Sequence, residues 1–166
     1  MTRRIRILSI CVLLSIAWSV CAFAQARVVV LPFRNMDGEI KYNVWSLQLS
    51  DSLTKLLLAN DTTQAKFVIV PNDSVEMAIS ELNLDPTNPQ YQSDVWKAVK
   101  AMGAVMVVQG NFFLRGERVL MNAYVYDMNT RMAHGTYFAK DIYKSPTSYM
   151  EAIPVMVKKL YPALIE

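Results

Sequence analysis

Three short runs of consecutive apolar residues predict strands that are buried on both faces. They span residues 27–33, 67–70 and 104–108, and Pro32 and Pro71 stop the apolar pattern of the first two. A run that is apolar at every position is typical of a central strand, because neither face of such a strand meets water. We therefore expect these three strands in the middle of a sheet.

The stretches between and after these runs repeat apolar residues at helical spacing. Asp73 and Glu76 have the spacing of a capping box, which places the start of one helix. Gly103 has the position expected of a residue that ends another helix. Residues 83–93 contain two prolines and are predicted as an exposed loop. The helices are expected over residues 41–59, from 72 to about 82, over 94–102 and over 148–165.

The chain between residues 104 and 142 has the pattern of two consecutive hairpins. The third strand continues through Phe113, and residues 115–117 then give a turn signal before an alternating strand over 119–127. Residues 127–130 form the next predicted turn, before a strand over 132–142. The predicted order is β-α-β-α-α-β-β-β-α. It indicates an α/β (α+β) fold with one mixed five-stranded sheet and three to four packed helices.

The first 24 residues have the three parts of a secretory signal peptide. Three arginines precede an apolar run, and Ala22 and Ala24 stand at the positions that a signal peptidase recognises. We expect cleavage before Gln25, with the bond between Ala26 and Arg27 as the alternative. Residues 25–166 are expected to form a single domain. An uncleaved membrane anchor is the other interpretation of this segment. Neither cysteine follows the small residue of a lipoprotein signal, so lipid attachment is not expected.

Charge and composition exclude several classes of function. The chain carries 17 Lys+Arg and 14 Asp+Glu, and the predicted signal peptide holds three of the arginines and no acid. The predicted mature chain is therefore neutral, which argues against nucleic-acid binding. Two cysteines and one histidine are too few for a structural zinc site. No membrane span is expected in the mature chain.

The sequence holds no recognisable constellation of catalytic residues. Phosphate-binding glycine motifs and the G-x-S-x-G motif of serine hydrolases are absent. His134 is the single histidine, and no serine or cysteine motif accompanies it. We therefore expect no catalytic residue, no cofactor and no metal, and we expect that the protein is not an enzyme.

Aromatic residues are the more informative feature. Trp96 lies on a predicted helix, and tryptophan is favoured both in cores and in interface hot spots. By strand alternation, one sheet face is expected to combine aromatic with polar side chains, and it fits either a docking surface or the layer beneath a helix. That face is expected to carry Asn122, Tyr124, Tyr126, His134 and Phe138.

Several short motifs resemble those of a known group of envelope domains. They are VVLPFRN at 29–35, Trp45 on a helix, MGAVMVVQG at 102–110, RGER at 115–118 and YD at 126–127. The chain resembles the N-terminal domain of TolB and the related FlgO-like, LpoB-type and CsgG-type periplasmic α/β domains. The resemblance implies this fold, an envelope location and a binding role without catalysis.

Together these observations predict a periplasmic or secreted accessory domain that binds another cell-envelope protein. The expected contact residues are Tyr91, Trp96, Arg115 and Tyr126, with the loop and the sheet edges beside them. A self-assembling envelope scaffold or a secretion-complex subunit, which would make the partner a homo-oligomer, is the main alternative. A small-ligand sensor or enzyme that uses the tyrosine and histidine face is the third.

Overall fold

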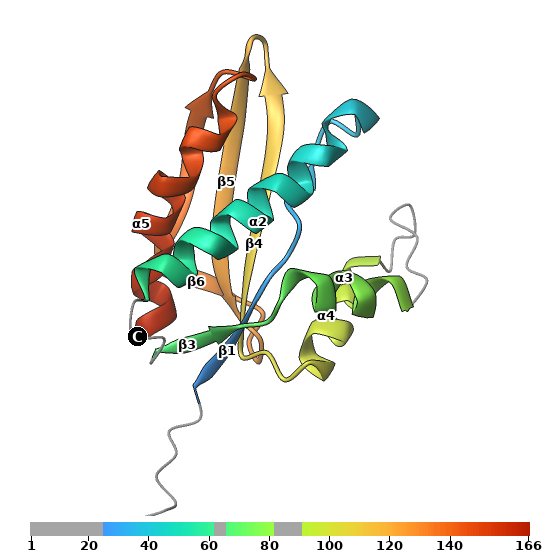
Figure 1. The fold of residues 1–166 in the computed structure, drawn as a ribbon, viewed down its shortest axis with the longest axis vertical. Helices are drawn as coiled ribbons and strands as arrows, with labels where there is room; N and C mark the ends of the chain where they lie inside the picture. The colour runs from blue at the N-terminus through green and yellow to red at the C-terminus, as the bar shows by residue number, and fades with distance from the viewer. Residues whose placement is uncertain (1–24, 62–65, 82–90) are drawn as a thin grey trace, which may run out of the picture.

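The described residues form one mixed sheet with helices packed on both of its faces (Figure 1). The computed structural model describes residues 25–61, 66–81 and 91–166, with side chains from residue 93 in the last range. The strand order is β3-β1-β4-β5-β6, and the short β2 pairs with β4 beyond the end of β1. The strands are β1 Ala26–Val30, β2 Arg34–Asn35, β3 Phe67–Ile69, β4 Met106–Arg115, β5 Arg118–Asp127 and β6 Ala133–Lys144.

The direction of pairing changes in the middle of the sheet. β1 is parallel to both β3 and β4, whereas β4, β5 and β6 are antiparallel neighbours. This change follows from the connections, because helices join the first strands and tight turns join the last three. β4 is therefore the strand at which the parallel and antiparallel halves meet.

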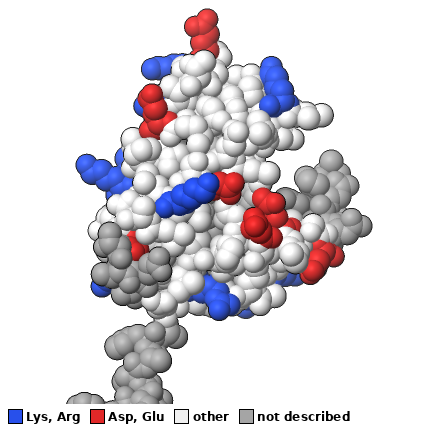
Figure 2. Space-filling model, viewed as in Figure 1, with Lys and Arg blue, Asp and Glu red and all other residues white. Residues whose placement is uncertain are grey.

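Four α-helices and two 3₁₀ turns complete the part of the chain that the structure describes. In Figure 1, α2 and α5 lie in front of the sheet, and α3 and α4 lie beside the end formed by β1 and β3. Figure 2 shows the α2–α5 side as mainly uncharged surface with scattered charged side chains. The helices are α2 Asn43–Asn60, α3 Asn72–Glu81, α4 Tyr91–Ala101 and α5 Ala152–Ile165, with 3₁₀ turns η2 Ile40–Tyr42 and η3 Tyr149–Glu151.

The main core lies between the sheet and the pair α2–α5. Every fourth residue of each helix points inward, which is the spacing that keeps side chains on one helical face. These side chains pack against Phe112 of β4 and against Phe33 between β1 and β2, both 2% exposed or less. The helix residues are Leu49, Leu53 and Leu57 of α2 and Met156, Leu160 and Leu164 of α5.

A second, smaller core lies on the opposite face. Val29 and Val107 of the sheet pack there against Val75 of α3 and Val99 of α4. β1 therefore contributes to both cores, since Val28 and Val30 belong to the first one. This arrangement explains why the β1 sequence is apolar at successive positions.

The structure confirms the predicted fold class, but β3 is an edge strand and not one in the middle of the sheet, and its Val68 is 43% exposed. The sixth strand, β2, arises because Pro32 has no N–H to donate. The pairing of β1 with β4 ends with the hydrogen bond from the Leu31 N–H to the Val108 carbonyl, at 2.9 Å. The chain pairs with β4 again from Arg34, as β2. Gly103 has a φ of 73°, as its predicted position after a helix requires.

The predicted start of α4 is wrong. Residues 91–93 belong to the first turn of α4 and not to the predicted loop 83–93, of which residues 83–90 lie outside the described residues. Asp94 was expected to begin the helix. An aspartate stabilises any position of the first turn through the helix dipole, so its presence does not fix the first residue. The predicted signal peptide, residues 1–24, also lies outside the described residues.

Candidate functional site

The strands β4, β5 and β6 have one face that α3 and α4 leave largely uncovered, here named the open face. The strand register places Tyr124 opposite both Gln109 and Phe138, and Leu120 opposite both Phe113 and Tyr143. Phe138 and Tyr143 are each 38% exposed although both are aromatic. The open face comprises Arg34, Gln109, Asn111, Phe113, Arg115, Arg118, Leu120, Asn122, Tyr124, Tyr126, Phe138 and Tyr143.

Aromatic rings follow one another across the open face. Trp96 of α4 meets Tyr126 edge-to-face, with 5.6 Å between the ring centroids. Tyr126 lies 6.2 Å from Tyr124, which is stacked on Phe138 at 6.1 Å. Contacts of this geometry are favourable and hold each ring in place. The row therefore crosses from α4 to the outermost strand, β6.

The open face also carries three arginines. At the hairpin end of the sheet, the guanidinium of Arg115 lies 5.5 Å from the Phe113 ring, and that of Arg118 lies 5.7 Å from the Tyr143 ring. These are cation–π distances. Arg34 reaches the open face from β2, opposite Asn111. None of the three arginines forms an ion pair with any of the described residues.

Tyr126 has a perturbed acidity. Partial burial raises the pKa of its hydroxyl above the usual value of about 10, and the neighbouring Tyr124 raises it further. The Arg34 guanidinium acts in the opposite direction, because a nearby cation favours the phenolate. Tyr126 is therefore neutral near pH 7, and its hydroxyl can donate as well as accept a hydrogen bond.

A buried amide fixes the backbone under the open face. The Asn122 side chain is 9% exposed, and its Nδ2 donates to Oδ1 of Asn111 at 3.0 Å. Its Oδ1 accepts a hydrogen bond from the Asp141 backbone N–H at 2.9 Å. Asp141 has a φ of 57°, and the register of β5 and β6 shifts beside it. Asn122 thus stabilises an irregular segment of β6.

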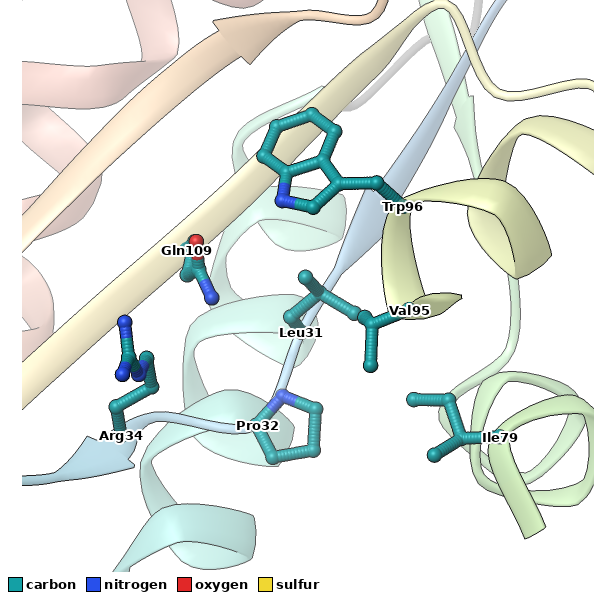
Figure 3. Close-up of a pocket in the computed structure, with 7 residues that line it drawn as sticks. All are labelled: Leu31, Pro32, Arg34, Ile79, Val95, Trp96 and Gln109. Atoms are coloured by element: carbon teal, nitrogen blue, oxygen red, sulfur yellow. The ribbon is translucent and has the colours of Figure 1, made fainter. Parts of the chain in front are cut away.

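A small pocket lies where the open face meets α3 and α4 (Figure 3). Its volume of about 50 Å³ is far below the roughly 300–1,000 Å³ of a typical small-molecule site, so it has room for one side chain. Figure 3 shows Trp96 on one side of the pocket and the polar ends of Arg34 and Gln109 near its rim. The remaining walls are Leu31, Pro32, Ile79 and Val95.

His134 does not share this face, although the sequence placed it there. Its ring stacks on Tyr137 at 5.1 Å, and its Nε2 lies 3.1 Å from the Glu166 carboxylate after the end of α5. The reason is a register shift: Tyr126 pairs with Ala133 and Tyr124 pairs with Phe138. The extra residues in β6 reverse the alternation on which the prediction depended.

Groups that could hold a metal ion are not found in the described part of the chain: no three His, Cys, Asp or Glu side chains come together there. No helix in the same part is long and apolar enough to cross a membrane.

The four expected contact residues are only partly brought together. Trp96 and Tyr126 touch, and Arg115 lies on the same open face at its hairpin end. Tyr91 is the first residue of α4, and its side chain is outside the described part.

Seven residues of the open face were not predicted from the sequence. Three of them, Gln109, Asn111 and Phe113, lie in the continuation of the third predicted strand, where they alternate with better-buried neighbours. Period-two alternation was thus the signal that could have found Phe113. The residues that were not predicted are Arg34, Gln109, Asn111, Phe113, Arg118, Leu120 and Tyr143.

Solved structures share this arrangement of strands and helices. The C-terminal domain of LpoB from Escherichia coli matches with a TM-score of 0.52 and 17% identity, over 75% of this chain and 86% of that one. The chain has an LpoB-type fold. Lipoprotein GNA1162 from Neisseria meningitidis matches with a TM-score of 0.53 and 16% identity, over 78% of this chain and 91% of that one. No family model and no curated protein matches the sequence.

The LpoB-type fold confirms the predicted resemblance at the level of the fold. At 16–17% identity, the likeness carries over the arrangement of strands and helices and not the residues of any site. The open face and the pocket beside it are therefore interpreted from the residues of this chain.

Proposed function

We propose that the protein is a non-catalytic accessory domain of the bacterial cell envelope that binds another envelope protein through its open face. The observation that carries the proposal is the row of partly exposed aromatic rings over β4–β6. The LpoB-type fold and the predicted signal peptide over residues 1–24 support the envelope location. Periplasmic and secreted locations both agree with that signal.

The composition of the open face supports a protein partner. Tyrosine, tryptophan and arginine are the residues most enriched among interface hot spots. The rings of Tyr124 and Phe138 are already held by stacking, so that binding orders few additional torsions. A surface of this kind binds without bond chemistry, and the adjoining pocket is too small for a cofactor.

The sheet edges fit a docking role less well than the open face does. β3 offers an edge of only three residues, and the outer edge of β6 carries Lys140, Asp141 and the irregular register. Charges and bulges are features by which proteins prevent strand addition. We therefore favour the open face over the edge as the binding surface.

Self-assembly is the second candidate, because a separate set of apolar residues is exposed before and along α2. Ile40 is 84% exposed, Val44 53% and Leu47 42%, at spacings that place them on one side of the chain. Size-exclusion chromatography with light scattering tests this candidate directly. A monomer at tens of micromolar excludes it, whereas a discrete oligomer that Val44→Asp dissociates supports it.

In-cell photocrosslinking tests the proposed function. The crosslinker p-benzoylphenylalanine replaces Phe138, which is 38% exposed, and in a control it replaces Val155 of α5, which is 39% exposed. We expect a discrete crosslink to another envelope protein from position 138 and none from position 155. The equal exposure ensures that a difference reports the surface and not accessibility.

Three results would count against the proposed function. Crosslinks only between copies of this chain would favour self-assembly. Equal crosslinking from positions 138 and 155 would show that the open face has no special role. Absence of any crosslink from position 138, with normal protein levels in the envelope, would exclude the open face as the binding surface.

A further inference from the structure

The open face has a one-sided charge. Three of its residues are arginines, Arg34, Arg115 and Arg118, and none is acidic. Two acids lie near the hairpin end, and Asp141 of β6 lies beside Asn122 with its carboxylate 4.0 Å from the Lys140 ammonium. Glu117 lies in the exposed turn, and the Asp37 carboxylate accepts the Leu114 backbone N–H at 2.6 Å. The face therefore presents cations beside exposed aromatic rings.

We propose that the open face binds an acidic, extended segment of the partner protein, with one apolar side chain of that segment in the pocket beside Trp96. This inference rests on the proposed function and names the chemistry of its partner. Carboxylates are the protein groups whose geometry matches a guanidinium ion, through paired hydrogen bonds. The arginines of the open face have no acidic partner within the described chain that would compete for them.

The spacing of the groups sets the length of the segment. The pocket includes Gln109, and Arg115 lies six residues further along the same strand. At about 3.4 Å per residue this separation is about 20 Å, which an extended segment of about seven residues spans. The segment would then place an apolar side chain at one end and carboxylates at the other.

The pocket supplies the anchor. Its walls are mostly aliphatic, and its volume of about 50 Å³ accepts one side chain. Arg34 and Gln109 stand at its rim, where they can bind the carboxylate or backbone of the residue next to the anchor (Figure 3). An apolar anchor in a pocket with charged contacts around it is the usual arrangement of an interface hot spot.

Peptide selection tests this inference without knowledge of the partner. A phage library of random twelve-residue peptides is selected against the purified protein, and enriched peptides are synthesised with a fluorescent label. We expect sequences rich in Asp and Glu with one apolar residue about six positions away. Fluorescence anisotropy then compares the protein with the double variant Arg115→Glu, Arg118→Glu.

The charge-reversed variant is expected to lose at least about tenfold in affinity. The matched control is Lys158→Glu, Lys159→Glu, which reverses two exposed cations of α5 and is expected to leave the affinity within about twofold. Ile79→Phe places a larger side chain in the pocket. It is expected to lower the affinity for peptides with the apolar residue more than the affinity for peptides in which serine replaces that residue. Thermal melts verify that each variant is folded.

Several outcomes would overturn the inference. Enrichment of basic or uncharged peptides would do so, as would equal loss of affinity in the two double variants. Tighter binding of heparin or of phosphatidylglycerol vesicles than of the acidic peptides, lost on Arg115→Glu, Arg118→Glu, would assign the arginines to a polyanion or a membrane. A crosslinked partner from position 138 with a basic contact surface would leave the proposed function intact and refute this inference alone.

Discussion

The two faces of β4–β6 are built from the same strands and differ in almost every property. On one face, Phe112, Met121 and Ala123 are fully buried beneath α2 and α5. On the other, Phe138 and Tyr143 remain 38% exposed, with arginines beside them. Strand alternation assigns residues to the two faces, but the helices decide which face becomes core.

This difference separates stability from binding. Removal of apolar surface from water stabilises a fold by about 25 cal/mol per Å², and the helix-covered face has already made that contribution. The open face keeps apolar surface in contact with water, so a partner can still gain by covering it. We therefore expect substitutions on the covered face to reduce the free energy of unfolding, and substitutions on the open face to reduce binding.

The largest effect is expected from Leu160→Ala. Leu160 is fully buried between α5 and the sheet, and truncation of such a residue leaves a cavity that costs about 2–5 kcal/mol. Val155→Ala on the exposed side of the same helix should change the free energy of unfolding by less than about 0.5 kcal/mol. Urea unfolding measures both. Similar losses for the two variants would contradict the assignment of the core.

A second test of the covered face uses its close packing against a backbone. A Cβ added at Gly110 would lie 2.2 Å from the Phe33 ring, which is buried. We expect Gly110→Ala to cost about 1–3 kcal/mol, because the ring must move. The control is Gly135→Ala in β6, where a Cβ would meet nothing within 4 Å. A smaller cost of Gly110→Ala in the Phe33→Leu background than in the native one would confirm that the contact is the cause, and an equal cost would refute it.

The fold could be predicted because its strongest signals are local. The apolar run of β1 identifies a strand that is covered on both faces, and helical spacing identifies α2 and α5. The apolar run at 67–70 identified a strand, but β3 lies at the edge of the sheet with Val68 43% exposed. The start of α4 was misplaced because Asp94 stabilises any position of the first turn. The short β2 was not expected, since it depends on pairing with β4 across Pro32 and not on its own sequence.

The open face could be predicted only in part. Alternation in β5 correctly grouped Tyr124 and Tyr126, but the register shift in β6 moved His134 to the opposite face. Arg34 joins the open face through long-range pairing, which no local pattern reveals. Among the described helices, α3 and α4 lie beside the end formed by β1 and β3 and leave this face largely uncovered, which is likewise a property of the assembled fold (Figure 1).

Asn122→Ala is expected to have an intermediate effect on the free energy of unfolding. Asn122 lies on the open face, but its hydrogen bonds stabilise the fold itself. Loss of its hydrogen bonds to Asn111 and Asp141 should cost about 1–2 kcal/mol. Asn111→Ala removes only the first bond and should cost less. Urea unfolding and the amide exchange rate of Asp141 measure the difference. Equal costs would show that the bond to β6 does not stabilise the bulge.

The double variant Phe138→Ser, Tyr143→Ser should distinguish the role of the open face in binding from the role of the covered face in stability. Both rings are already partly exposed, so we expect the free energy of unfolding to fall by less than about 1 kcal/mol for the pair. Crosslinking from the neighbouring position 124, with p-benzoylphenylalanine in place of Tyr124, should nevertheless be lost. A large loss of stability with retained crosslinking would reverse the assignment of roles to the two faces.

The smallest effect is expected from Arg34→Gln, and it tests whether the open face is electropositive without a partner bound. Arg34 lowers the pKa of Tyr126, which burial and Tyr124 raise. Because the cation favours the phenolate, its removal should raise that pKa further above about 10. Lys158→Gln on α5 serves as the control and should leave the titration unchanged. NMR titration of the Tyr126 ring carbon measures the shift directly. A pKa that falls, or that does not change, would mean that the Arg34 charge is compensated near Tyr126 and is not available to an acidic partner.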